Sequence, residues 1–298
     1  MKTTMISPKT ILCFADQLEQ SQQLANALNI SCHTIDIHRF PDGEIKLTLP
    51  HNLPSHVIIY CSLNNPNEKL IALLLAAETA RKLEVKTLTL VAPYLCYMRQ
   101  DIAFHAGEAV SQTIIGKFLA NLFENIITVD PHLHRIQYLS QAVPAKNAIS
   151  VSATSLMATF LSQRFKTPVL LAPDSEAEQW VKAVANPNGW EYGVCQKIRA
   201  GDKHVNITLP NLNLNERHVI LVDDVASSGQ TLIETIKLCL LQNAAEVNIL
   251  VTHALFGEDI HLCMKNAGAS NIWSTDSVTH PTNQIKLCGL LEQAISNL

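Results

Sequence analysis

The sequence predicts an α/β protein made of two similar halves, each a mostly parallel sheet with helices on both faces. Short apolar runs alternate with longer amphipathic stretches along the whole chain. The apolar runs are continuous, which is typical of strands buried on both faces of a parallel sheet. The length of 298 residues is enough for two domains of ordinary size.

Eight apolar runs are predicted to be strands because each is short and lies between helical stretches or turns. They cover residues 10–14, 57–61, 87–92, 126–129, 169–172, 193–196, 219–222 and 247–253. The segments between them are amphipathic and predict helices. These cover residues 17–28, 68–83, 108–122, 152–165, 175–184, 231–242 and 258–266, and a last helix covers 284–298.

A faint internal repeat supports two halves. Residues 85–95 resemble residues 247–255, and each segment follows a long helix and precedes a loop. Residues 126–130 and 219–223 also match, as strands that end in aspartate. Chance similarity between apolar strands is the alternative explanation.

The predicted division gives a first domain of residues 1–147 and a second of residues 148–298. The last helix of the second domain could pack back on the first domain. We place the boundary near residues 145–150.

Composition bounds the class of protein. The net charge of −4 argues against a general nucleic-acid binder, and no apolar run is long enough to span a membrane. Residues 1–5 are not followed by the apolar core of a secretory signal. The eight cysteines form no CxxC pair, so we expect reduced, buried thiols in a cytoplasmic protein rather than zinc or disulfides.

The most informative segment ends a buried strand with two acids and continues as a hydroxyl-rich turn before a helix. It contains Asp223, Asp224, Ser227, Ser228, Gly229 and Thr231. Backbone N–H groups at the start of a helix favour a phosphate, while paired acids can hold sugar hydroxyls or a magnesium ion. A sugar phosphate satisfies both parts. An ordinary turn capped by Ser or Thr is the alternative, but it needs only one hydroxyl and no paired acids.

Two further acids follow predicted strands. Asp130 and His132, in Asp130-Pro131-His132-Leu133-His134, can converge on one cation or on phosphates. A polar turn with solvated histidines is the alternative. Asp174 stands where α/β folds place their ligands, at the carboxyl end of a strand, and capping of the next helix is its alternative role.

Arg99, Gln100 and Asp101 form a polar loop in which the arginine can pair with a polyphosphate. Glu108 is expected to begin the following helix, where the helix dipole favours an acid. A loop closed by an Arg–Asp salt bridge is the alternative.

A second loop reads Phe40-Pro41-Asp42-Gly43-Glu44. Phe40 can stack on a base, while Asp42 and Glu44 can accept hydrogen bonds from an exocyclic amine. A simple β-turn of the Pro-Asp-Gly type is the alternative.

Lys197 and Arg199 occupy alternate positions of an extended segment, so we expect both to face one site. Two cations there can stabilise charge that develops on a transferring phosphoryl group. A solvated basic edge is the alternative.

Together, and in the order in which they occur along the chain, these six segments resemble those of the ribose-phosphate diphosphokinases, also called PRPP (phosphoribosyl-diphosphate) synthases. The resemblance covers nearly the whole chain and implies two phosphoribosyltransferase-like domains. The segments RQDxxFxxGEAxS and KxRxGD are most similar to the archaeal-type branch, which has a short catalytic loop.

The resemblance implies transfer of the diphosphoryl group of ATP to O1 of ribose 5-phosphate, giving PRPP and AMP, with Mg²⁺ as cofactor. It implies catalytic roles for Lys197 and Arg199, and metal binding by His132 and Asp174 with Asp130 nearby. The implied ATP-binding residues are Phe40, Asp42, Glu44, Arg99, Gln100 and Asp101. The implied ribose 5-phosphate residues are Asp223 and Asp224 for the hydroxyls, and Ser227, Ser228, Gly229 and Thr231 for the phosphate.

The resemblance also implies a homo-oligomer of at least two subunits, because the Phe40 loop of the family reaches the ATP site of a neighbouring subunit. The chain departs from the family pattern at Ser227-Ser228, at Gln230 and in the loop after Asp174, which contains Glu176 and Glu178. Two other functions stay open, a phosphoribosyltransferase that uses PRPP and a non-catalytic regulator associated with PRPP synthases. The N-terminal half with its ATP-type loops argues against the first. The retained Lys197, Arg199, His132 and Asp174 argue against the second, whereas the altered segment at Ser227-Ser228 and Gln230 argues for it.

Overall fold

The computed structural model of the chain describes residues 9–200 and 204–298, without the side chains of residues 197–206. The chain divides into two compact units, unit 1 with Met1–Val151 and Leu287–Leu298, and unit 2 with Ser152–Lys286. This division lies a few residues after the predicted boundary at residue 147, because strand β8 (Asn147–Val151) pairs along its whole length with β7 (Asn125–Val129). Residues 287–298, placed in the second domain by sequence, belong to unit 1.

Unit 1 contains a six-stranded parallel sheet in the order β2-β1-β5-β6-β7-β8. The strands not yet defined are β1 (Lys9–Cys13), β2 (Ser31–Thr34), β5 (His56–Tyr60) and β6 (Thr87–Val91). Successive side chains of a strand point to opposite faces, yet both Ile58 and Ile59 are fully buried. Helices therefore cover both faces of the sheet, which explains the continuous apolar runs in the sequence.

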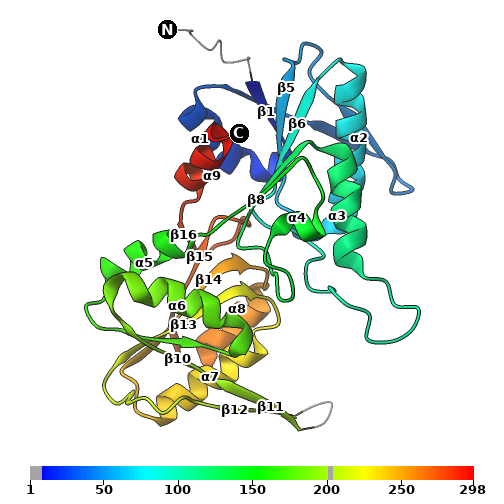
Figure 1. Ribbon diagram of the computed structural model, residues 1–298. Coiled ribbons are helices and arrows are strands. Elements are labelled where there is room, and N and C mark those ends of the chain that lie inside the picture. The colour runs from blue at the N-terminus through cyan, green and yellow to red at the C-terminus, as the bar shows by residue number, and fades with distance from the viewer. Residues whose placement is uncertain (1–8, 201–203) are drawn as a thin grey trace. The chain divides into compact units, whose positions relative to one another are not determined.

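The helices of unit 1 form two layers (Figure 1). One layer contains α1 (Leu18–Leu28) and α9 (Cys288–Ser296), which pack against each other. The other contains α2 (Pro66–Lys82) and α3 (Ser111–Leu122), whose apolar side chains share a core with β5 and β6. The short helix α4 (Leu139–Ala142) and the antiparallel hairpin of β3 (Asp36–Arg39) and β4 (Ile45–Thr48) complete the unit.

Unit 2 repeats this plan with a parallel sheet in the order β10-β9-β13-β14-β15-β16. Its strands are β9 (Val169–Ala172), β10 (Glu191–Val194), β13 (His218–Ala226), β14 (Glu246–Ala254), β15 (Ala269–Thr275) and β16 (Asn283–Ile285). Its helices are α5 (Thr154–Ser162), α6 (Glu178–Ala185), α7 (Gln230–Leu241) and α8 (Glu258–Asn266). A hairpin of β11 (Gln196–Ala200) and β12 (His204–Thr208) precedes β13.

The sheets of the two units correspond strand by strand. In each, a strand–helix–strand unit is followed by an antiparallel hairpin and then by the third strand of the sheet. The predicted architecture of two similar α/β halves is therefore confirmed. The match between residues 85–95 and 247–255 reflects corresponding strands, β6 and β14. The match between residues 126–130 and 219–223 does not reflect corresponding strands, because β13 corresponds to β5 rather than to β7.

Several elements were not predicted from the sequence. They are the edge strands β2, β8 and β16, the strand β15 and most of the two hairpins. The predicted strand 193–196 spans two elements, β10 and β11. The helix expected to start at Glu108 starts at Ser111, because the Glu108 carboxylate turns back to accept a hydrogen bond from the Phe104 N–H at 2.7 Å. Within residues 9–200 and 204–298, no helix is long and apolar enough to cross a membrane.

Candidate active site

Asp223 and Asp224 lie inside strand β13, which continues four residues beyond its predicted end and pairs with β14. Asp224 is 3% exposed and Asp223 is partly buried. The Asp224 N–H donates to Oδ1 of Asp223 at 2.9 Å, and the Val225 N–H donates to Oδ1 of Asp224 at 2.8 Å. Each carboxylate is thus held by the backbone of the next residue at the carboxyl end of a central strand.

The electrostatics of this strand end favour a bound partner. Burial raises the pKa of the Asp223 carboxyl, and the charges of Asp224 and Asp174 raise this pKa further. The loop after β9, the strand next to β13, therefore brings Asp174 within electrostatic reach of Asp223. Hydroxyl donors or a cation placed here would relieve the repulsion between the three acids.

The turn after β13 starts a helix without a side-chain cap. Ser227 and Ser228 are exposed, and Gly229 is the N-cap residue of α7 with φ of 67°. A Cβ atom on Gly229 would lie 2.7 Å from Cγ2 of Ile260, so a glycine is required both by conformation and by space. The first N–H groups of α7 consequently point toward a turn of small residues, an arrangement that suits a phosphate.

Gln230, a departure from the family pattern, does not enter the turn. Its amide Nε2 donates to Oε1 of Glu234 at 3.3 Å, one helical turn further on, and its side chain is exposed. The side chain thus runs along α7 and leaves the backbone of the turn accessible.

The other predicted site residues of unit 2 are Asp174, in the loop after β9, and Lys197 and Arg199, in the hairpin β11–β12. Oδ1 of Asp174 accepts a hydrogen bond from the Glu176 N–H at 3.1 Å, so the capping role considered as an alternative is present. Lys197 and Arg199 lie two residues apart in β11, opposite Ile207 and Val205 of β12. Their side chains lie outside the part of the chain that the structure describes.

In unit 1, the Phe40 loop is the tip of the hairpin β3–β4. The Phe40 N–H donates to the Glu44 carbonyl at 2.8 Å, and the Glu44 N–H donates to Oδ1 of Asp42 at 3.1 Å. Gly43 has φ of 93°, which favours glycine. The segment is therefore a tight turn, as its alternative interpretation states, and it presents Phe40 with 41% of its surface exposed.

The loop that contains Arg99 is held by its polar side chains. Nε2 of Gln100 donates to the Ile102 carbonyl at 2.9 Å. Oδ1 of Asp101 pairs with Arg135 at 2.6 Å, so Asp101 forms its ion pair with an arginine that the sequence did not single out. Within residues 9–200 and 204–298, Oδ2 of Asp101 is a buried oxygen without a hydrogen-bond partner.

Asp130 follows β7 in a left-handed backbone conformation, with φ of 37°, and is 6% exposed. Two residues later, Nε2 of His132 lies 2.6 Å from Nε2 of His134. One imidazole donates and the other accepts, so His134 fixes the orientation of the His132 ring.

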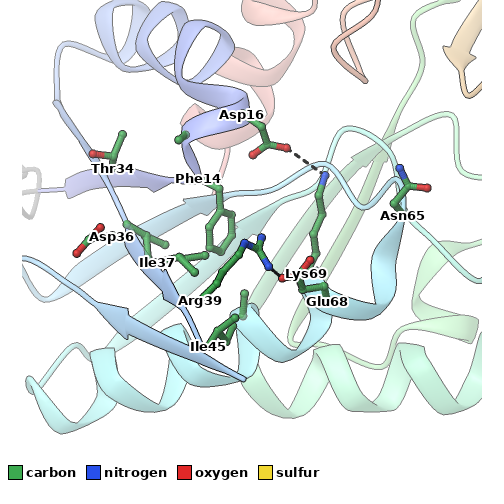
Figure 2. Close-up of a pocket in the computed structure, with 13 residues that line it drawn as sticks. Phe14, Asp16, Thr34, Asp36, Ile37, Arg39, Ile45, Asn65, Glu68 and Lys69 are labelled. Carbon is green, nitrogen blue, oxygen red and sulfur yellow. Dashed lines mark ion pairs between the residues drawn. The ribbon is translucent and has the colours of Figure 1, made fainter. Parts of the chain in front are cut away.

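A cavity of about 610 Å³ lies at the carboxyl end of β1 in unit 1 (Figure 2). It is lined by Phe14, Asp16, Asp36 and Lys69 among others, none of which the sequence analysis singled out. Arg39 and Glu68 form an ion pair at its wall that joins the hairpin to α2. The sequence could have indicated this cavity through the end of the first predicted strand. The loop after that strand, β1, corresponds to the Asp174 loop after β9 in unit 2.

Comparison with known proteins agrees with the two-unit architecture. Residues 10–126 match the N-terminal domain of ribose phosphate pyrophosphokinase, and residues 145–272 match the phosphoribosyl transferase domain. The phosphoribosylpyrophosphate synthetase of Mycobacterium smegmatis has a similar structure, with a TM-score of 0.83 at 18% identity over 97% of this chain and 98% of that one. This likeness concerns the fold.

Curated relatives cover almost the same length. The ribose-phosphate pyrophosphokinase of Methanopyrus kandleri is 29% identical over 97% of this chain and 99% of its own length. The ribose-phosphate pyrophosphokinase of Sulfolobus acidocaldarius is 30% identical over 85% of this chain and 87% of its own length. The resemblance seen in the six sequence segments is confirmed, and the chain belongs to the ribose-phosphate pyrophosphokinase family.

Proposed function

We propose that this chain transfers the diphosphoryl group of ATP to O1 of ribose 5-phosphate, giving PRPP and AMP. The observation that carries the proposal is the end of β13, where two fixed carboxylates are followed directly by the N-terminus of α7. Carboxylates accept hydrogen bonds from sugar hydroxyls, and a helix N-terminus binds phosphate. A complete N-terminal unit, similar to that of ribose phosphate pyrophosphokinase, favours synthesis of PRPP over its consumption.

In unit 2, Asp223 and Asp224 bind the 2- and 3-hydroxyls of the ribose. The turn holds the 5-phosphate through Ser227, Ser228, Gly229 and Thr231. The raised pKa of Asp223 supports this assignment, because hydroxyl donors stabilise the ionised carboxylate that burial disfavours. The position of Gln230 beside Glu234 leaves the turn accessible to the phosphate.

In unit 1, Phe40 stacks on the adenine while Asp42 and Glu44 accept hydrogen bonds from its amine. Arg99, Gln100 and Asp101 lie along the phosphates of ATP. The ion pair between Asp101 and Arg135 supports a further cation at this loop, because it fixes a guanidinium that suits a phosphate.

The donors fit magnesium. Asp130 and Asp174 supply carboxylate oxygens and His132 supplies an imidazole nitrogen, and Oδ2 of Asp101 is a buried oxygen that can accept from water on a hydrated ion. We assign metal binding to His132 and Asp174, with Asp130 orienting nearby. Bound Mg²⁺ neutralises charge on the phosphates of ATP.

Lys197 and Arg199 carry the catalytic roles. O1 of the ribose attacks the β-phosphorus and AMP leaves, so the protein contributes position and charge rather than covalent chemistry. Two cations from one strand of the β11–β12 hairpin stabilise the charge of the transferring group. None of the residues assigned here acts as a general base in this proposal.

We also propose a homo-oligomer of at least two subunits in the cytoplasm, without nucleic-acid or membrane partners. The eight free cysteines support a reducing compartment. The exposed Phe40 at the tip of a protruding hairpin supports an exchange of loops between subunits.

The experiment is ³¹P NMR of the protein with ATP, Mg²⁺ and ribose 5-phosphate. We expect AMP and PRPP to appear together, and Lys197→Ala to lower the rate roughly 10²- to 10³-fold. Lys182→Ala, which changes a lysine of α6, is the matched control. Pyrophosphate release from PRPP and a free base, without PRPP synthesis, would identify a phosphoribosyltransferase. A folded protein that produces neither would identify the non-catalytic regulator.

A further inference from the structure

Two cysteine sulfur atoms lie next to each other on the edge of the unit 1 sheet. Sγ of Cys13, the last residue of β1, is 3.8 Å from Sγ of Cys32 in β2. Both are free thiols, Cys13 fully buried and Cys32 partly exposed. Neither has a role in the proposed reaction, so the proposed function does not account for the pair.

The strand register argues against a disulfide between them. Cys13 pairs with Thr34, and Cys32 pairs with Ile11, so the two cysteines share a face of the sheet but are offset by two residues. With a rise of about 3.3 Å per residue and a strand spacing of about 4.8 Å, their Cα atoms are about 8 Å apart. A disulfide needs Cα atoms within about 7 Å. Oxidation would therefore require movement of the backbone.

The sulfur–sulfur distance, that of a thiol–thiol contact, is also compatible with a different chemistry. A zinc-class ion bonds thiolate sulfur at about 2.3 Å in tetrahedral geometry, which sets the two sulfurs about 3.8 Å apart. We propose that Cys13 and Cys32 form a dithiol site that chelates one thiophilic centre, such as a d¹⁰ divalent ion. The sequence disfavoured zinc because it has no CxxC pair, whereas here strand pairing brings together two cysteines 19 residues apart.

The surroundings suit a bound cation. The Asp16 carboxylate, three residues further along the chain, interacts electrostatically with Cys13. An acid close to the ligands favours a positive centre. The partly exposed Cys32 gives the ion a route to the pair, and water completes its coordination.

A dithiol-specific probe tests the site. Phenylarsine oxide condenses with two thiols to form two As–S bonds, and the two thiol protons leave with the oxygen as one water, without change of oxidation state. Trypsin releases both cysteines in one peptide, residues 10–39, because no lysine or arginine lies between Thr10 and Arg39. We expect one arsenical per reduced chain on this peptide. Cys13→Ser and Cys32→Ser each abolish it, and Cys263→Ser, which removes an exposed thiol, leaves it unchanged.

A second measurement uses the metal. Equilibrium dialysis of Zn²⁺ in excess Mg²⁺ compares the wild-type chain with the serine variants, and we expect either serine to lower retention at least about tenfold. The imidazoles of His132 and His134 contribute equally in all variants, so the difference isolates the thiols. Arsenical labelling at another peptide, or Zn²⁺ retention unchanged in folded Cys32→Ser protein, overturns the proposal. Neither readout depends on the proposed activity.

Discussion

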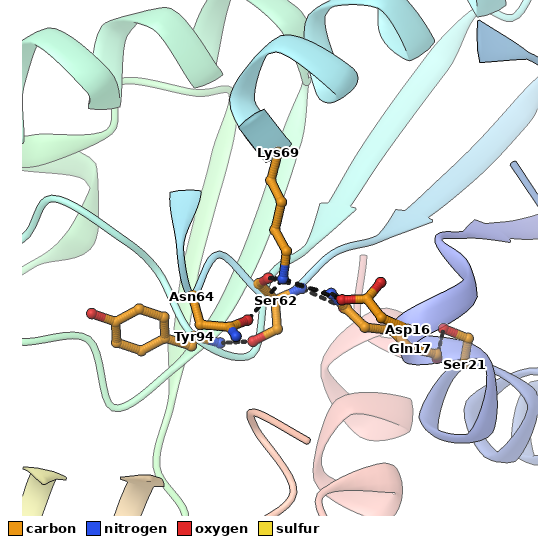
Figure 3. A network of polar contacts seen from close by, with 7 residues as sticks. All are labelled: Asp16, Gln17, Ser21, Ser62, Asn64, Lys69 and Tyr94. Carbon is orange, nitrogen blue, oxygen red and sulfur yellow. Dashed lines mark hydrogen bonds and ion pairs between the residues drawn. The ribbon is translucent and has the colours of Figure 1, made fainter. Parts of the chain in front are cut away.

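The ammonium nitrogen of Lys69 lies 3.4 Å from Oδ2 of Asp16 and so joins the first turn of α2 to the loop after β1 (Figure 3). The same nitrogen donates to the Ser62 carbonyl and to Oδ1 of Asn64, each at 2.8 Å. In unit 2, the loops after the corresponding strands, β9 and β13, carry the acids and the turn proposed to bind ribose 5-phosphate. In unit 1, the Lys69 ammonium therefore lies between the two loops that correspond to the proposed ribose 5-phosphate loops of unit 2.

The first prediction concerns this lysine. Lys69→Met removes three polar contacts of a side chain that is only 18% exposed, and leaves the Ser62 carbonyl with a single donor, Nε2 of Gln17 at 3.3 Å. We expect a loss of about 1–3 kcal/mol in the free energy of unfolding, measured by urea denaturation. Lys82→Met is the matched control on the same helix, exposed and expected to change stability by less than about 0.5 kcal/mol. Equal losses for both variants would show that the network contributes nothing.

The second prediction concerns the turn before α7. Gly229 and Gly189 have similar φ angles of 67° and 64°, but a Cβ atom meets Ile260 at 2.7 Å on Gly229 and nothing within 4 Å on Gly189. Both Gly→Ala variants add backbone strain of about 1 kcal/mol, and only Gly229→Ala adds a steric clash. We expect Gly229→Ala to lose about 1–3 kcal/mol more in urea unfolding, and its KM for ribose 5-phosphate to rise. Identical behaviour of the two variants contradicts the steric argument.

The sequence predicted the central strands and most of the helices because buried parallel strands are continuous apolar runs and the helices are amphipathic. It missed edge strands such as β2, Ser31-Cys32-His33-Thr34, because an exposed edge shows no apolar pattern. It placed Asp223 at the end of a strand, although β13 continues to Ala226, because the acids interrupt the apolar run.

The candidate site residues were proposed from motifs, and their contacts could not be predicted from the sequence. Nothing local indicated that Asp101 pairs with Arg135, since 34 residues separate them. The direction of the Gln230 side chain likewise depends on Glu234, one helical turn away. The Cys13–Cys32 pair arises only from the register of two strands, which the sequence does not state.

The third prediction concerns pH. Because burial and neighbouring charges raise the pKa of Asp223 in the folded chain, the folded state holds this proton more tightly than the unfolded state. The associated stability is present below the pKa of the unfolded chain, about 3.9, and is lost as pH rises through the higher folded pKa. Asp223→Asn removes the loss of stability that comes from ionising the buried carboxyl. We therefore expect its Tm to exceed that of the wild type by more at pH 8 than at pH 5, with a higher KM for ribose 5-phosphate.

Ser227→Ala is the control for this effect. It changes an exposed, uncharged residue of the same loop, so its Tm difference from the wild type should be independent of pH. A Tm difference for Asp223→Asn that shrinks as pH rises would reverse the sign and refute the assignment of a raised pKa.

The fourth prediction tests the proposed exchange of loops between subunits. Phe40 lies on the hairpin of unit 1, and Lys197 lies on the hairpin of unit 2. If an active site takes Phe40 from one subunit and Lys197 from another, Phe40→Ala and Lys197→Ala proteins are each inactive alone. Mixed dimers restore one intact site of two, so an equal mixture regains about a quarter of the wild-type activity when subunits exchange at random.

Two affinity tags on the two variants allow mixed oligomers to be purified and assayed for AMP release. A double variant, Phe40→Ala with Lys197→Ala, mixed with wild type is the control, because the altered residues then sit in the same chain. If the loops are exchanged, mixed dimers of this control contain no intact site, because the remaining Phe40 and the remaining Lys197 belong to different sites of the pair. When the loop crosses between subunits, the control mixed dimers are therefore inactive, while the mixed dimers of the two single variants keep one active site. If each site takes Phe40 and Lys197 from the same subunit, the result is reversed: the control mixed dimers keep one active site, and the mixed dimers of the two single variants are inactive.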